Sequence, residues 1–182
     1  MKLNLKLEHD SPAERRTRTD LLELAQLHDL QPWLFTDTII IDETARPHSH
    51  PVLTLNVNYE QNEYFLLASF VHEQLHWFEE ERKEIRDRAI EATRDSYPEV
   101  ISSRPEGSGD ERSTRLHLLV CYLEYQILKV LIGAAAAQQT ILELSHHHYR
   151  WIYATVLRDE KKIERVVREF AFFPDGLRAQ FY

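Results

Sequence analysis

The sequence predicts an α+β fold: a small antiparallel or mixed sheet from the N-terminal third, packed on a long helix and followed by an all-helical C-terminal half. Two observations support this prediction. Segments of alternating or β-branched apolar residues all lie before residue 60, whereas from residue 62 onward the apolar residues recur with helical spacing. The length of 182 residues favours one domain over the whole chain, residues 1–182.

Three strands are expected in the N-terminal third. Apolar and polar residues alternate in the first and third of these segments, and the second is rich in β-branched residues. The segments are KLNLKL (2–7), DTIIID (37–42) and PVLTLNVNY (51–59). The segment ETARPHSH (43–50) is then expected to be a hairpin loop between the second and third strands.

Helices are expected between the first two strands and throughout the second half. The segment 11–30 has a capping serine, Ser11, and a proline at the first helical position. A long helix is predicted from Asn62 to about Arg94, and a long loop over 97–113, where two prolines and two glycines prevent a helix. Further helices are predicted over 114–132, 135–145, 147–158 and 160–170.

Composition narrows the functional classes. The net charge of −8 disfavours a nucleic-acid partner, because the chain as a whole repels phosphate backbones. The most apolar segment, 116–132, contains polar and charged side chains that would be costly in lipid, so no membrane partner is expected. One cysteine cannot form an internal disulfide, and the N-terminal residues lack the apolar core of a signal peptide. These features predict a cytoplasmic protein.

The segment VHEQLHWFEE (71–80) contains the most specific chemical signal. It has two histidines four positions apart, His72 and His76, with Glu73 directly after the first. On a helix, both imidazoles can converge on one ion, while Glu73, rotated by about 100°, reaches a water molecule beside that ion. The apolar flanks make unpartnered histidines costly, which favours a metal. The spacing therefore predicts a metal site.

An alternating strand followed by a helix with HExxH resembles the zincin metallopeptidases, in a minimal form of the gluzincin type. The resemblance implies that His72 and His76 bind Zn²⁺ and that Glu73 is the general base. It also implies a zinc-dependent hydrolase that cleaves a peptide or small amide substrate with a metal-activated water. The longer pattern HExxHxxGxxH is absent, because HEQLHWFEEER has neither that glycine nor that third histidine, so a metzincin is excluded.

A catalytic zinc needs a third protein ligand, and the segment 114–132 offers two. Helical phase puts His117, Cys121 and Glu124 on one buried stripe. The solvent side is expected to carry Arg115, Gln126 and Lys129.

One ion is not expected to bind both candidates, because seven helical residues separate His117 from Glu124 by about 10 Å. His117 is the predicted ligand, since it lies near the helix start, where a side chain can open onto a cleft. Glu124 is the alternative ligand or a residue that orients one imidazole. The alternative without a metal is a core histidine with satisfied hydrogen bonds and a glutamate bonded to it or to a tyrosine. The gluzincin resemblance itself favours a glutamate, but the NExxSD-type signature is missing.

Five further residues are candidate contacts for the substrate or for the oxyanion that forms on it. They are His48, His50, His148, Tyr149 and Tyr153.

Two other functional classes remain open. Glu73–His76 and Glu143–His146 are both Glu-x-x-His pairs, as in carboxylate-bridged di-iron bundles. Such bundles also need a glutamate from each of two further helices, and strands before the motif do not belong in them. A metal-free interaction protein of zincin-like fold is the second alternative.

Overall fold

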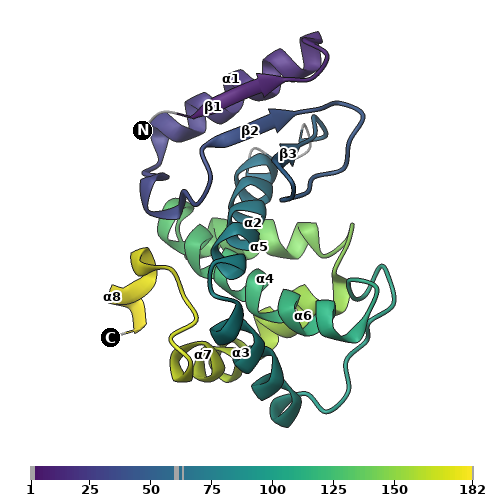
Figure 1. Cartoon of the computed structure of the whole chain (residues 1–182), viewed down its shortest axis with the longest axis vertical. Coiled ribbons are helices and arrows are strands. Elements are labelled where there is room, and N and C mark those ends of the chain that lie inside the picture. The colour runs from purple at the N-terminus through teal and green to yellow at the C-terminus, as the bar shows by residue number, and fades with distance from the viewer. Residues whose placement is uncertain (1–2, 60–61, 63, 182) are drawn as a thin grey trace. The chain divides into compact units, whose positions relative to one another are not determined.

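The computed structural model describes residues 3–59, 62 and 64–181 of the chain. It consists of two compact units, Met1–Phe78 and Glu79–Tyr182. The described residues form a three-stranded sheet and eight α-helices (Figure 1), which confirms the α+β class. The assignment of 1–182 to a single zincin-like domain stays a prediction.

The sheet of the first unit is parallel. Its strands are β1 (Asn4–Leu7), β2 (Thr38–Ile41) and β3 (Leu53–Leu55), in the order β1-β2-β3, and both neighbouring pairs are parallel. The expected antiparallel or mixed sheet is therefore not what the strands form. The reason lies between β1 and β2, where α1 (Pro12–Leu27) returns the chain to the end at which β1 began, so that β2 runs in the same direction.

The segment 43–50 is not a hairpin between β2 and β3. Ile39 pairs with Leu53 in a parallel register, so the chain must cross back before β3 begins. The chain reverses direction between His48 and Thr54. The backbones of these two residues form an isolated antiparallel bridge, with N···O distances of 3.1 and 2.8 Å. The segment does contain a turn, as predicted. This turn pairs residue 48 with β3 in an antiparallel bridge and does not pair β2 with β3 in a hairpin.

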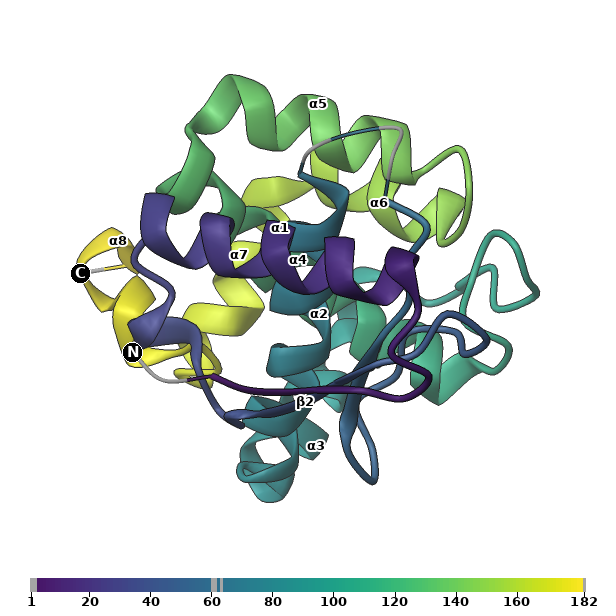
Figure 2. The ribbon, with the colours of Figure 1, turned by 90° about the horizontal axis from the view of Figure 1, so that it is seen from above.

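Helix α1 covers one side of the strands, as Figure 2 shows, and contacts β1 and β2. The side chain of Ser11 accepts a hydrogen bond from the backbone N–H of Glu14, and Pro12 occupies the first turn, as predicted. The carboxylate of Glu14 is fully buried and accepts the backbone N–H groups of His9 (2.9 Å) and Glu43 (3.1 Å). It thereby connects α1 to the segments that follow β1 and β2.

Helix α2 (Phe65–Glu80) carries the HExxH motif and is buried on almost every side. Within it, the buried amide of Gln74 accepts the backbone N–H groups of Phe35 (2.8 Å) and Thr36 (2.9 Å) and donates to the carbonyl of Thr36 (2.7 Å). Gln74 thus fastens α2 to the segment that leads into β2.

The long helix predicted from Asn62 to Arg94 is two helices. Helix α2 ends at Glu80, and α3 (Lys83–Ser96) begins after two intervening residues, the second of which, Arg82, has a non-helical backbone. Three successive glutamates, 79–81, stand at this point, where the negative end of the helix dipole disfavours acidic side chains. Glu63, inside the predicted start, lies outside the described residues.

The second unit is helical, and α4 (Glu111–Ile132) contacts α3 and three later helices. Within the ranges that the structure describes, no helix is long and apolar enough to cross a membrane. Two short 3₁₀ turns, Gln31–Trp33 in the first unit and Asp175–Leu177 in the second, complete the elements. The remaining helices are α5 (Ala134–Leu144), α6 (Arg150–Arg158), α7 (Glu160–Glu169) and α8 (Arg178–Phe181).

The prediction that Arg115, Gln126 and Lys129 lie on the solvent side of α4 is wrong for the first two. Arg115 is 1% exposed and Gln126 is 5% exposed. Both are buried because each has polar partners. The guanidinium of Arg115 donates to the carboxylate of Glu111 (3.0 Å) and to the carbonyls of Tyr97 (2.8 Å) and Pro98 (3.2 Å). The amide of Gln126 donates to the Glu160 carboxylate, which also pairs with Lys129.

The buried guanidinium makes Arg115→Met a sensitive test of this packing. The substitution removes the donors for two carbonyls, so the free energy of unfolding should fall by about 2–4 kcal/mol in urea titrations. Arg112→Met is the matched control on the same helix: its side chain is 58% exposed and pairs with Asp87, so a loss below about 1 kcal/mol is expected. Equal losses would contradict the role of Arg115.

The second stability prediction concerns Gln74. Gln74→Leu leaves the N–H groups of Phe35 and Thr36 without their acceptor, so the free energy of unfolding should fall by about 2 kcal/mol. Hydrogen exchange at these two amides should accelerate as well. Gln139→Leu is the control, because Gln139 is exposed and bonds only the Glu143 side chain among the contacts described. Unchanged exchange at both amides would show that Gln74 does not hold α2 in this way.

Candidate metal centre

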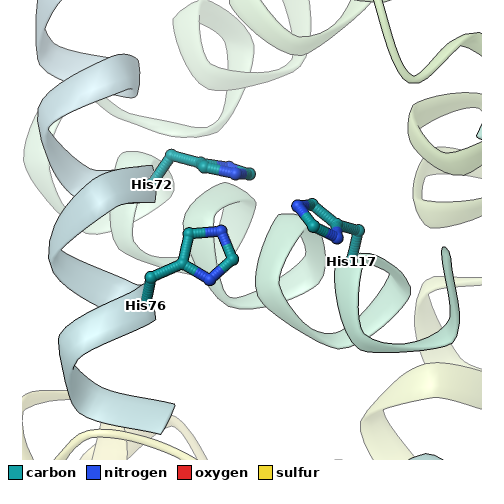
Figure 3. A group of neighbouring side chains, drawn as sticks. All are labelled: His72, His76 and His117. Carbon is teal, nitrogen blue, oxygen red and sulfur yellow. The ribbon is translucent and has the colours of Figure 1, made fainter. Parts of the chain in front are cut away.

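Helix α2 presents the two motif histidines on the same side, one turn apart (Figure 3). The centroids of the His72 and His76 rings are 5.0 Å apart, and the rings are inclined at 72°. His72 is 8% exposed and the adjacent Glu73 is 7% exposed, while His76 is half-buried. Two imidazoles and a carboxylate therefore share the middle of a helix in which no residue is exposed.

Tyr59 adds a polar group near Glu73 that the sequence did not single out. Burial raises the pKa of Tyr59 to about 12, and the negative charge of Glu73 contributes to the same shift. Tyr59 is therefore an uncharged phenol at neutral pH, and its hydroxyl donates to Oγ of Ser69 (3.2 Å), one turn before Glu73. Nothing in the sequence distinguished Tyr59 from the other aromatic residues that close a predicted strand.

His48 and His50 lie in the loop before β3 and are both exposed. The ring of His50 stacks on Trp77 of α2, with centroids 4.5 Å apart and an interplanar angle of 20°. Nε1 of Trp77 donates to the carbonyl of Ser49 (2.9 Å), so the loop is fixed to α2 directly after His76 in sequence. His48 instead uses its backbone to pair with Thr54.

In the second unit, His117 extends from the first part of α4 (Figure 3) and is 8% exposed. Its Nδ1 lies 2.7 Å from the carbonyl oxygen of Ser113, which can only accept, so the ring proton resides on Nδ1. Its Nε2 accepts a hydrogen bond from the hydroxyl of Tyr149 (3.0 Å). A zinc ligand has this arrangement, with one nitrogen oriented by a carbonyl and the other carrying a lone pair.

Glu124, two turns further along α4, is 1% exposed and has a different partner. The hydroxyl of Tyr153 donates to both of its carboxylate oxygens, at 3.3 and 3.2 Å. Burial raises the pKa of Tyr153 well above its usual value, and the charge of Glu124 raises it further, so the phenol keeps its proton. The predicted buried stripe of α4 is confirmed, since Cys121 is buried as well.

His148 and Tyr149 belong to the turn that precedes α6, and Tyr153 belongs to α6 itself. The predicted helix start at 147 is thus wrong, because residues 145–147 form a turn after α5 and α6 begins only at Arg150. The ring of His148 lies 4.9 Å from that of Tyr149 and 5.8 Å from that of Tyr153.

The candidate residues therefore form one group in each unit. In the first, α2 brings together His72, Glu73 and His76. In the second, α4 and the segment entering α6 bring together the residues His117, Glu124, His148, Tyr149 and Tyr153.

Another group of potential ligands in the first unit has a structural explanation. Atoms of His9, Glu14 and Asp42 lie within 4.8 Å of one another. Both oxygens of Glu14 already accept backbone N–H groups, and Oδ1 of Asp42 accepts the backbone N–H and the hydroxyl of Thr44, each at 2.8 Å. These carboxylates close the turns after β1 and β2.

Comparison with known proteins identified no family: no protein-family model, no curated protein and no solved structure matched the chain.

Proposed function

We propose that the protein is a zinc-dependent hydrolase of peptide or small amide bonds, with His72, His76 and His117 as zinc ligands and Glu73 as the general base. The observation that carries the proposal is the placement of His72 and His76 side by side on α2, with the buried Glu73 between them in sequence. This is the local geometry that HExxH chemistry needs.

The surroundings of the motif favour a metal over a purely structural role. Burying imidazoles and a carboxylate among apolar residues is costly unless each group has a strong partner. Gln74, in the middle of the motif, resolves that problem with three hydrogen bonds to backbone groups. A zinc ion bound by His72 and His76 would be a strong partner of this kind, and its binding free energy would contribute to folding.

The choice of His117 as third ligand rests on its two ring nitrogens. The Ser113 carbonyl holds the proton on Nδ1, which leaves Nε2 as the nitrogen able to bind an ion. Glu124 accepts the Tyr153 hydroxyl with both oxygens, so it is better suited to shaping the surroundings of the site than to binding zinc.

A zinc ion bound there would supply a Lewis acid for the scissile carbonyl and would lower the pKa of the attacking water. Glu73 accepts the proton from that water and transfers it to the leaving amine. Tyr149, Tyr153 and His148 are the candidates for stabilising the developing oxyanion. His48 and His50, exposed in the loop fixed to Trp77, are candidate substrate contacts.

The di-iron alternative has less support. Its second Glu-x-x-His pair is Glu143–His146, and the Glu143 carboxylate accepts the exposed amide of Gln139 (2.7 Å). His146 is exposed in the turn after α5. Di-iron ligands project into a bundle interior, which this pair does not do.

Metal analysis tests the ligand assignment. Purified protein should contain about one zinc per chain, and His72→Ala or His117→Ala should each weaken zinc binding by at least about 100-fold, more than the loss of an outer hydrogen-bond partner. His146→Ala is the matched control and should leave zinc binding unchanged. Two irons per chain, with dependence on His146, would favour the di-iron alternative, and a metal-free chain would favour an interaction protein.

The general-base role predicts that Glu73→Gln keeps zinc but loses hydrolysis by about 10²–10⁴-fold, because the amide cannot accept the proton. Cleavage of a mixed peptide library, followed by mass spectrometry, measures this loss. Glu81→Gln is the control, since that side chain is 61% exposed just beyond α2. Normal turnover by Glu73→Gln would rule out the proposed mechanism.

A further inference from the structure

Tyr149 has an unusual backbone for a bulky residue. At the position before α6 its φ is 50° and its ψ is 36°, in the left-handed region that favours glycine or asparagine. The surrounding chain maintains this conformation: the N–H of Arg150 donates to the carbonyl of Pro105, and that of Trp151 donates to the carbonyl of Glu106, both at 3.1 Å. A non-glycine residue kept in a disfavoured backbone conformation is typical of functional sites, which indicates a functional role for the Tyr149 side chain.

The side chain of Tyr149 is directed at His117. The two ring centroids are 4.7 Å apart, and the hydroxyl lies 3.0 Å from Nε2. Because the proton of His117 resides on Nδ1, facing the Ser113 carbonyl, Nε2 must be the acceptor and the phenol the donor. The lone pair of Nε2 is therefore engaged by Tyr149.

That lone pair is the one that a zinc ion would need, and it cannot serve a phenol proton and an ion at once. We propose that the Tyr149 hydroxyl occupies the position on His117 that zinc would take. Without zinc, this hydrogen bond holds His117 in the tautomer and orientation of a ligand. The hydroxyl must release Nε2 when zinc binds. This inference rests on the proposed function, because it assumes that His117 binds zinc.

The two partners of His117 then have opposite effects on zinc affinity. The Ser113 carbonyl bonds the nitrogen that does not bind the ion, so it supports binding. Tyr149 competes for the nitrogen that does. The net strength of a hydrogen bond of this kind corresponds to a zinc affinity lowered by about 2- to 12-fold.

The chain contains its own control for this effect. Tyr153, one turn into α6, makes the analogous contact with Glu124 on α4. If His117 is the ligand, only the Tyr149 hydroxyl competes with zinc. If Glu124 were the ligand, the Tyr153 hydroxyl would compete in its place.

The test is zinc affinity, measured by competition with a chromophoric chelator, for the wild type, Tyr149→Phe and Tyr153→Phe. Tyr149→Phe should bind zinc about 2- to 12-fold more tightly, and Tyr153→Phe should match the wild type. Tyr149→Asn, which accepts the left-handed backbone and lacks the phenol, should also bind more tightly. It keeps the inference testable if Tyr149→Phe folds poorly.

Unchanged or weaker zinc binding in both Tyr149 variants would overturn the inference while leaving the proposed function intact, provided that binding still depends on His72. Tighter binding in Tyr153→Phe alone would also overturn it, by making Glu124 the third ligand. Failure of the wild type to bind zinc would overturn the proposed function and the inference together.

Discussion

The constraint on which the candidate site depends is the placement of polar side chains in helices that are buried on nearly every side. In α2 the consecutive residues His72, Glu73 and Gln74 are all buried. Each needs a hydrogen-bond or ionic partner, because burying a polar group without one lowers the free energy of unfolding by more than a typical surface contact raises it. Gln74 has such partners in backbone groups of the chain before β2. The two motif imidazoles, one turn apart on the same helix, are the groups that we propose bind an ion.

Helix α4 meets the constraint with three different kinds of partner. Arg115 bonds a carboxylate and two carbonyls, His117 lies between the Ser113 carbonyl and the Tyr149 phenol, and Glu124 accepts the Tyr153 phenol. The arginine has a structural role, because its hydrogen bonds connect α4 to Tyr97 and Pro98 in the preceding loop of the second unit. The histidine differs, since its acceptor nitrogen accepts a hydrogen bond from the neutral hydroxyl of Tyr149, the donor that the proposed ion would replace.

The sequence predicted the elements better than their connections. The cap at Ser11, most of the helices and the burial of His117, Cys121 and Glu124 follow from local chemistry and periodicity, which can be read from a single sequence. The parallel sheet did not follow from the strand patterns, although the intervening α1 is the signal that could have predicted it. The break at residues 81–82 depends on the position of acidic residues at a helix end, which periodicity does not report.

Site residues were predictable where one helix holds them. His72, Glu73 and His76 follow from spacing alone, because four residues make one turn. Arg115 could not be recognised as buried, since its partners Tyr97 and Pro98 come from the preceding loop. Tyr149 was a candidate from its neighbourhood of histidines, but its bond to His117 depends on a left-handed turn that the residue type itself disfavours.

The coordination shell of the zinc-loaded protein tests the central claim most directly, and zinc K-edge X-ray absorption reads it without knowledge of a substrate. A site of His72, His76 and His117 should give nitrogen and oxygen neighbours at about 2.0–2.1 Å, with the outer-shell scattering of three imidazoles and no sulfur. A sulfur neighbour at about 2.3 Å would point to Cys121 and contradict the His72, His76 and His117 site. A shell with two imidazoles and a carboxylate would also contradict this site, because it would make Glu124 the third ligand.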